Sequence, residues 1–128
     1  MIKMIYCIRR LPDISEDEFH RYWLEKHGPL VRKNLAALKV KRYVQSHTIP
    51  DTDDLPVNEI IRQPRGSKEP YDGTAELWWE SMDDLLEIAG TPEGVNAAEE
   101  NLEDEKNFID FSRSSIFIVE EHEIYNEL

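Results

Sequence analysis

The chain has 128 residues, 33% of them charged, and its formal net charge at pH 7 is −12. This length predicts one domain, residues 1–128, which buries roughly two-thirds of the surface that the unfolded chain exposes. The negative balance argues against nucleic acid as a partner, because phosphate contacts need clustered Lys and Arg. No apolar run approaches the ~18 residues of a membrane span, so we expect no membrane partner.

Cysteine usage and the acidic segments narrow the class further. Cys7 is the only cysteine, so no internal disulfide can form. The N-terminal residues alternate in character, whereas a signal peptide is continuously apolar after a basic start, so we expect a reduced, cytoplasmic protein. Acidic residues concentrate in segments 51–54 and 99–105, and we interpret both as solvated surfaces.

The first part of the chain predicts a strand followed by a long helix. Residues 2–9 alternate and are rich in Ile and Tyr, which is typical of a strand. Ser15 and Glu18 form a capping box that begins a helix. The apolar positions of this helix recur at helical spacing: Phe19, Tyr22, Trp23, Leu30, Val31, Leu35 and Leu38.

Trp23 and His27 form the most informative feature of this helix. They lie four residues apart, which places them on one face and one turn apart. Gly28 and Pro29 follow directly, and Pro29 has no N–H for the carbonyl of Glu25, so we expect a kink or a break. An imidazole beside an indole at a helix break predicts the wall of a pocket.

The remaining elements predict a strand, a long loop, a strand, two helices and a last strand. Their ranges are 39–49, 50–70, 71–79, 81–88, 91–108 and 115–125. The loop 50–70 holds four of the seven prolines and three aspartates, a composition that breaks regular structure. Loops of this length are often lids or binding loops.

The order β-α-β-β-α-β predicts an α+β, ferredoxin-like fold, with a four-stranded antiparallel sheet and both helices on one face. The strands are apolar on both sides: Ala75, Leu77 and Trp79 share one face, while Trp78 points to the other. A sheet with one solvated face should instead alternate between apolar and polar residues. We therefore expect a homodimer in which the two sheets pack into an α+β barrel.

Polar side chains along the second strand and in the first helix are the candidates for chemistry. Tyr43, Gln45 and His47 alternate and so point to one face, where they line a pocket or form the exposed end of an edge strand. His27 is a structural residue or a general acid–base group, since the imidazole pKa of ~6.5 lies near neutrality. Trp78 and Trp79 point to opposite faces, so one packs under the helices.

Metal and cofactor motifs are missing from the sequence. His20 and His27 are seven residues apart rather than the four of a zinc-binding helix, and His47 has no His or Cys neighbour. The chain carries no glycine-rich nucleotide motif and no G-x-S-x-G elbow. We expect neither a metal nor a cofactor.

Three segments in the same order along the chain resemble the EthD-like proteins. They are Phe19-x-x-Tyr-Trp23-x-x-x-His27-Gly-Pro-x-Val31, Tyr43-Val-Gln-Ser-His47 and Tyr71-Asp-Gly-Thr-Ala-Glu-Leu-Trp-Trp79. The resemblance implies a small dimeric α+β barrel with a pocket between sheet and helices in each subunit. It also implies cofactor-free isomerisation, dehydration or cyclisation of aromatic or lactone-like metabolites in some relatives. Other relatives are accessory products of catabolic gene clusters.

The resemblance singles out His27, with Trp23 beside it, while His47, Tyr43 and Asp72 match positions that recur. The leading hypothesis is a lyase or isomerase in which His27 is the general base or acid and His47 or Tyr43 is its partner. Its substrate is a small hydrophobic molecule. The candidate substrate-binding residues are Trp23, Tyr22, Asp72, Trp78 and Trp79.

Two rival hypotheses use the same fold. The first is a non-catalytic dimeric protein that holds a hydrophobic metabolite and needs no proton donor. The second is a heme-binding barrel with an axial histidine. For Trp23 and Tyr22, the alternative to ligand binding is packing in the core.

Overall fold

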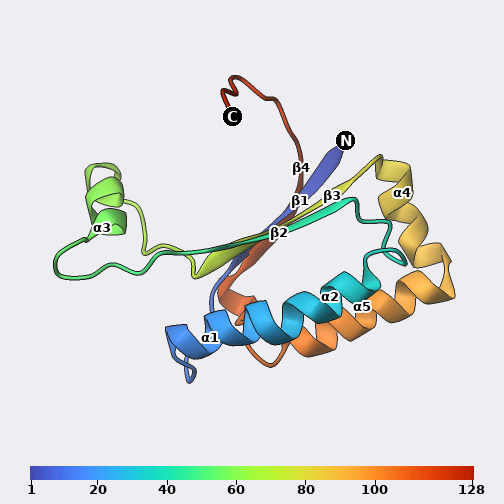
Figure 1. Cartoon of the computed structure of the whole chain (residues 1–128), viewed down its shortest axis with the longest axis horizontal. Helices are drawn as coiled ribbons and strands as arrows, with labels where there is room; N and C mark the ends of the chain where they lie inside the picture. Colours follow the sequence, from blue (N-terminus) through green and yellow to red (C-terminus); the bar gives the residue numbers. More distant parts are fainter.

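The computed structural model describes all 128 residues and shows one antiparallel sheet in the order β2-β3-β1-β4. Helices α1, α2 and α5 lie along one face of the sheet, and α3 projects from one end of it (Figure 1). The strands are β1 Ile2–Ile8, β2 Arg42–His47, β3 Gly73–Trp79 and β4 Ser115–Glu120. The helices are α1 Glu16–Tyr22, α2 Gly28–Asn34, α3 Val57–Arg62, α4 Met82–Glu87 and α5 Pro92–Glu105. The predicted ferredoxin-like α+β fold is confirmed, and none of the helices has the length and apolar composition to span a bilayer.

Strand alternation sorts the two neighbouring tryptophans as the sequence predicts. Trp79 is 2% exposed, and its Nε1 donates to the Leu38 carbonyl at 2.7 Å on the helix side of the sheet. Trp78 lies on the opposite face, where its ring is covered by Lys3 at 4.9 Å and Arg42 at 4.5 Å. The row with Trp79 therefore packs under the helices, while the outer face of β3 carries Trp78 together with Glu76, which pairs with Lys3.

Of the kink or break expected at Gly28-Pro29, the break does not occur, because the helix continues through a widened turn. Residues Trp23–His27 form a π-helical turn, in which the Gly28 N–H donates to the Trp23 carbonyl five residues earlier. Pro29 then lies in the first turn of α2, where a missing N–H is tolerated. The widened turn leaves the Trp23 carbonyl free to accept a second hydrogen bond, from Gln45 Nε2 at 2.9 Å.

The core forms where α1, the sheet and the chain after α5 meet. Its buried members are Ile8, Phe19, Trp23, Ala75, Phe108 and Ile109. The Phe19 ring lies 5.4 Å from Trp23 and 5.7 Å from Phe108, in the tilted geometry that aromatic pairs prefer. These contacts fix the π-helical turn against β3 and against the end of α5.

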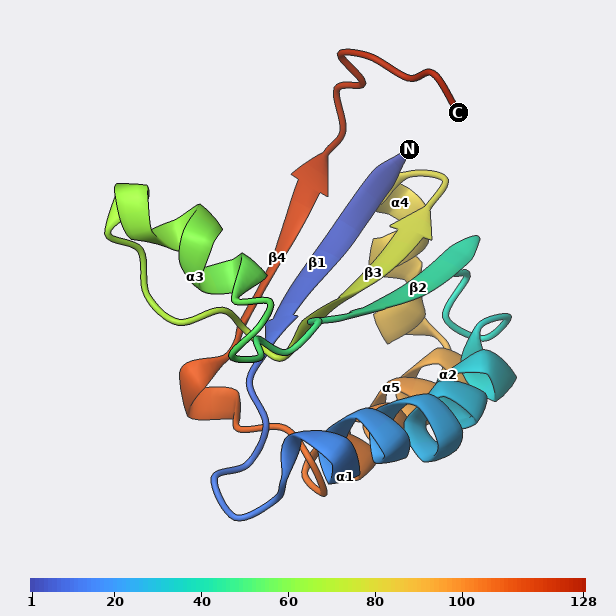
Figure 2. The ribbon, with the colours of Figure 1, turned by 60° about the vertical axis from the view of Figure 1, so that its left-hand side comes forward.

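The predicted loop 50–70 contains regular structure. It folds into α3 and a 3₁₀ turn, Gln63–Arg65, beyond the end of the sheet (Figure 2). The Asp51 carboxylate caps the first turn of α3, because it accepts the backbone N–H groups of Asn58 at 2.8 Å and Glu59 at 3.0 Å. The segment is thus an ordered excursion between β2 and β3.

The approach of Trp23 to Gly73 gives a stability prediction. A Cβ atom at Gly73 would lie 2.5 Å from both the Trp23 ring and the Ser46 carbonyl. Gly73→Ala should therefore lower the free energy of unfolding by about 1–3 kcal/mol, measured by urea denaturation. The matched control is Gly90→Ala, where a Cβ meets nothing within 4 Å. Equal midpoints for the two variants would contradict the close packing.

Candidate functional site

A cavity of about 270 Å³ lies between the sheet and the helices. Apolar side chains of β1, β3, α2 and the segment around α4 form most of its wall, including Met4, Leu77, Trp79, Val31 and Leu85. Five residues with polar groups also line it: Tyr6, His27, Tyr43, Asn101 and Glu105. An apolar recess with a few convergent polar groups has the character of a small-molecule site.

His27 is the polar group with the best-defined orientation. It is 6% exposed, and its Nδ1 lies 2.8 Å from Oδ2 of Asp104 on α5. Asp104 Oδ1 accepts the Tyr22 hydroxyl at 2.6 Å, so the carboxylate is itself held in place. A carboxylate only accepts, which assigns the hydrogen to Nδ1 and leaves the lone pair on Nε2. Nε2 makes no hydrogen bond, yet every fully buried side-chain nitrogen and oxygen has a partner, so Nε2 is open to the cavity.

The electrostatics of this pair favour a neutral imidazole beside an ionised carboxylate. Burial lowers the pKa of His27, although Asp104 opposes this effect. Burial raises the pKa of Asp104, but hydrogen bonds from Tyr22 and His27 outweigh it, and the pKa of Asp104 is lowered overall. At neutral pH the site therefore presents an oriented base.

Glu105 is a second titratable group in the same cavity. Burial raises its pKa from the ordinary 4.5 to about 7, opposed by the hydroxyl of Tyr6. Burial and the adjacent Glu105 also raise the pKa of Tyr6. A carboxyl with this pKa exists in both forms near neutral pH, so it can give or take a proton.

Asp104 and Glu105 were missed by the sequence reasoning, which interpreted 99–105 as a solvated surface. That interpretation is wrong for the end of the segment, since Glu105 lines the cavity and Asp104 binds His27. A helical signal was present in Ala97, Asn101 and Glu105, which recur every four residues on the buried side of α5. Ala97 and Asn101, uncharged residues in a highly charged helix, mark the face that packs, and Glu105 is the next position along that face.

Hydrogen bonds join the polar side chains of β2, which are Tyr43, Gln45 and His47, and Tyr43 lines the cavity. Gln45 Nε2 donates to the Tyr43 hydroxyl at 2.7 Å, and Gln45 Oε1 lies 2.8 Å from His47 Nε2. Because Oε1 only accepts, His47 carries its hydrogen on Nε2, and its Nδ1 accepts from His20 Nδ1 at 2.7 Å. Burial and the neighbouring His20 lower the pKa of His47. The His47 ring also stacks on Trp23, with centroids 4.3 Å apart.

The structure therefore brings together only some of the residues singled out from the sequence. His27, Tyr43 and Trp79 line the cavity. Trp23 is a core residue, Tyr22 orients Asp104, and His47 lies behind Gln45. Asp72 lines a different, polar pocket, and Trp78 faces away from the helices.

A family model described as EthD domain matches residues 11–112. The chain belongs to the EthD family. The match runs from just before α1 to just before β4, so it includes His27, Asp104 and Glu105, whereas β1 and β4, which supply part of the cavity wall, lie outside it. No curated protein sequence is significantly similar to the chain.

Solved structures support the fold at low sequence identity. An EthD family protein from Bacillus halodurans is 16% identical, with a TM-score of 0.60 over 95% of this chain and 99% of that one. A dimeric protein with a ferredoxin-like fold from Bacteroides fragilis is 12% identical, with a TM-score of 0.56 over 93% and 94%. SnoaB, a cofactor-independent oxygenase from Streptomyces nogalater, is 10% identical, with a TM-score of 0.51 over 98% and 97%. These likenesses show the same architecture.

The raised pKa of Glu105 predicts how stability depends on pH. The folded state holds a proton on Glu105 between pH 4.5 and about 7 that the unfolded state has released. The protonated Glu105 side chain is therefore better tolerated in the folded state than the ionised one. The Glu105 contribution to the free energy of unfolding is highest at low pH and falls by up to about 3 kcal/mol as the pH rises through about 7. Glu105→Gln should remove that loss, so the variant gains stability relative to wild type between about pH 5 and about pH 8.

Urea unfolding at both pH values measures this difference. His27 and Asp104 have lowered pKa values and so lose stability on acidification in both proteins, which leaves the comparison unaffected. Glu99→Gln, an exposed position on α5, is the matched control and should follow the wild type. An identical pH dependence for Glu105→Gln and wild type would show that Glu105 is ionised throughout.

Proposed function

We propose that the protein is a cofactor-independent enzyme that moves a proton on a small hydrophobic molecule, aromatic or lactone-like, in a catabolic or secondary-metabolic pathway. The observation that carries this proposal is the Asp104–His27 pair, whose free Nε2 opens into an apolar cavity. SnoaB, which has the same architecture, is described as cofactor-independent, and this agrees with a reaction carried out by side chains alone.

The proton transfer can be written with the residues that line the cavity. His27 Nε2 takes a proton from a carbon next to a carbonyl group, and the electron pair forms an enolate. Asp104 then faces an imidazolium ion and stabilises its charge through the Nδ1 hydrogen bond. Protonated Glu105 gives its proton to the enolate oxygen or to a second carbon, which completes an isomerisation, or to a leaving hydroxyl, which completes a dehydration.

The cavity also limits the substrate. Its volume of about 270 Å³ falls just below the roughly 300–1,000 Å³ of most ligand pockets, which fits a molecule with one or two rings. The only acidic side chain in its wall is Glu105, and Asp104 lies directly behind His27. A substrate carboxylate placed there would meet two acidic groups in an apolar setting, so the substrate is neutral at its buried end.

Deuterium exchange tests the proposal without knowledge of the natural reaction. Aryl ketones and unsaturated lactones incubated with the protein in D₂O should exchange the hydrogen next to the carbonyl, followed by NMR. His27→Gln should slow this exchange by about 10²–10⁴-fold, because the general base is lost. Asp104→Asn should slow it less, since it changes the orientation of the ring and leaves the base in place.

The control and the contrary outcome separate enzyme from binding protein. Lys26→Gln, next to His27 but exposed, should exchange at the wild-type rate. Binding of these probes with equal affinity to wild type and His27→Gln, with exchange in neither, would support the alternative of a non-catalytic metabolite-binding or accessory protein.

We further propose that the protein forms a homodimer through the outer face of the sheet, as the two-sided apolar strands predict. Ile5 and Phe117 are paired across β1 and β4 on this face, and Phe117 is 45% exposed. This apolar strip, which lies beside the Lys3–Glu76 ion pair, favours a cover. The Bacteroides fragilis protein of similar architecture is described as dimeric.

Sedimentation of the two relevant variants tests the dimer. The wild type should sediment as a dimer at micromolar concentration, and Phe117→Glu should shift it to a monomer because a charge is placed inside the interface. Leu24→Glu, which changes a 61% exposed residue on the helical side, should leave the dimer intact. A monomeric wild type would refute the proposed interface.

A further inference from the structure

Besides His27, the buried residues with polar side chains are Asn34 and Asn101, which are 8% and 9% exposed. Asn34 is the last residue of α2, and Asn101 lies on α5. The two amides are in contact, because Asn34 Nδ2 donates to Asn101 Oδ1 at 2.9 Å. Asn101 also lines the internal cavity, and the proton transfer proposed above does not use it.

The carboxylate of Glu100 fixes the orientation of both amides. Hydrogen bonds from Asn34 and Lys33 lower the pKa of Glu100, so it is ionised at neutral pH. A carboxylate only accepts, so the amide group of Asn34 that lies 2.9 Å from Glu100 Oε1 is the nitrogen. The second N–H of that nitrogen points to Asn101, which therefore presents its oxygen to Asn34. As a result, the nitrogen of Asn101 faces away from Asn34.

Asn101 Nδ2 keeps both of its hydrogens without a protein acceptor. The hydrogen bond of the Asn101 side chain is the one that its oxygen accepts. Every fully buried side-chain nitrogen and oxygen has a partner, so Asn101 Nδ2 is not fully buried and opens to the cavity that this residue lines. Buried polar groups are normally paired, so a nearly buried amide with two free donors calls for an acceptor in the cavity.

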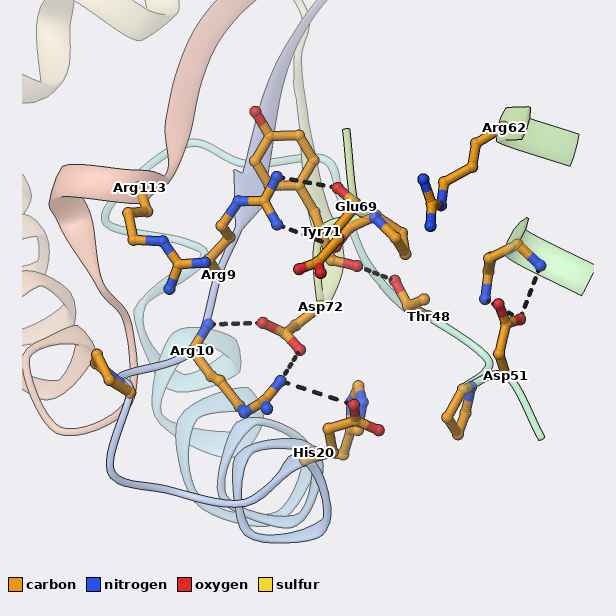
Figure 3. A pocket seen from close by; sticks show the side chains of 15 residues that line it. Arg9, Arg10, His20, Thr48, Asp51, Arg62, Glu69, Tyr71, Asp72 and Arg113 are labelled. Carbon is orange, nitrogen blue, oxygen red and sulfur yellow. Dashed lines mark hydrogen bonds and ion pairs between the residues drawn. The ribbon is translucent and has the colours of Figure 1, made fainter. Parts of the chain in front are cut away.

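The polar pocket at the end of the sheet contrasts with this arrangement (Figure 3). There Asp72 binds the guanidinium of Arg10 at 2.7 Å and the Arg10 backbone N–H at 2.8 Å. Arg9 donates to the carbonyls of Pro70 and Glu69 at 3.1 and 3.0 Å. These groups are already bound to protein atoms, whereas the nitrogen of Asn101 is not.

Helix geometry places the Asn101 donor beside the groups of the proposed proton transfer. Asn101 lies three residues before Asp104 and four before Glu105 on α5, so its Cβ is about 5–6 Å from theirs. Asp104 in turn binds His27 at 2.8 Å. Asn101, Glu105 and His27 line the same cavity, so one molecule of one or two rings can contact all three.

We infer, on the basis of the proposed function, that Asn101 is a further catalytic residue whose Nδ2 donates to the carbonyl oxygen of the substrate, and that Asn34 is its positioning residue. When His27 takes the proton from the adjacent carbon, the electron pair forms a carbon–carbon double bond and negative charge develops on that oxygen. A donor already aimed at the oxygen stabilises this charge without reorganisation. The ligand class is therefore a neutral ketone or lactone whose carbonyl group lies at the buried end.

Two probes with the same rings test the donor: 1-indanone, which carries a carbonyl group, and indane, which does not. A hydrogen bond lowers the stretching frequency of a carbonyl group, so 1-indanone bound to the wild type should show a lowered frequency by infrared spectroscopy. Asn101→Leu and Asn101→Ala should both raise it, and should weaken 1-indanone binding relative to indane by about 2- to 10-fold. Deuterium exchange into 1-indanone should slow by about 10²–10³-fold in both variants. Binding of indane reports that the cavity is intact in each variant.

A separate substitution tests the positioning role of Asn34. In the Asn34→Asp, Glu100→Gln double variant, a carboxylate faces Asn101 and accepts from its nitrogen, which turns the Asn101 oxygen toward the cavity. This variant should therefore raise the carbonyl frequency as Asn101→Leu does, an effect that a merely structural role would not produce. Glu100→Gln alone is its control and should match the wild type, because a glutamine oxygen can still accept from Asn34.

The remaining control and the contrary outcomes separate this inference from the proposed function. Asn96→Leu changes an exposed asparagine of the same helix and should leave frequency, affinity and exchange unchanged. Equal carbonyl frequencies in the wild type and both Asn101 variants would overturn the inference, as would failure of 1-indanone to bind the wild type. Exchange that is lost in His27→Gln but unchanged in the Asn101 variants would refute the catalytic role of Asn101 and leave the proposed function standing. Frequency shifts as expected, with no exchange in any protein, would refute the proton transfer but support the contact of Asn101 with a carbonyl group.

Discussion

The close contact between the Trp23 indole and Gly73 is the constraint on which both recesses depend. Trp23 is 1% exposed and can reach β3 only because Gly73 has no side chain. The contact fixes the start of the π-helical turn, and four residues later the same turn presents His27 to the cavity. The indole also stacks on His47, the cross-strand neighbour of Gly73, and His47 accepts from His20, which lines the polar pocket. One packing contact therefore sets the position of the base and the wall behind it.

Burial then gives each polar group of the cavity a distinct protonation state. The His27 pKa moves down and the Glu105 pKa moves up, both because water is removed. Asp104 keeps its charge because three side chains donate to it. An apolar space with a neutral base, an ionised orienting carboxylate and a carboxyl that titrates near 7 is suited to exchanging protons with a neutral molecule.

The fold could be predicted from the sequence because its signals are local. Alternation predicted that Trp78 and Trp79 point to opposite faces, although not which of them packs under the helices, and the spacing of Trp23 and His27 located the irregular turn. The nature of that turn could not be predicted: Pro29 indicates a missing hydrogen bond, but whether the chain breaks or widens depends on what Trp23 packs against. The partner of His27 could not be predicted either, because Asp104 lies 77 residues away within an acidic run. Asp104 and Glu105 face the interior only because α5 packs in the folded structure.

The two recesses differ in polarity, and this follows from where the chain places its charges. Near the internal cavity the acidic groups dominate, so an anion entering it would lose its hydration and gain only repulsion. At the end of the sheet, four arginines and four carboxylates share the wall of the polar pocket, so charges of both signs face each other there. No lining residue belongs to both recesses. Ligand binding in each recess is therefore a separate property. A substitution in one recess can be compared with the unchanged properties of the other.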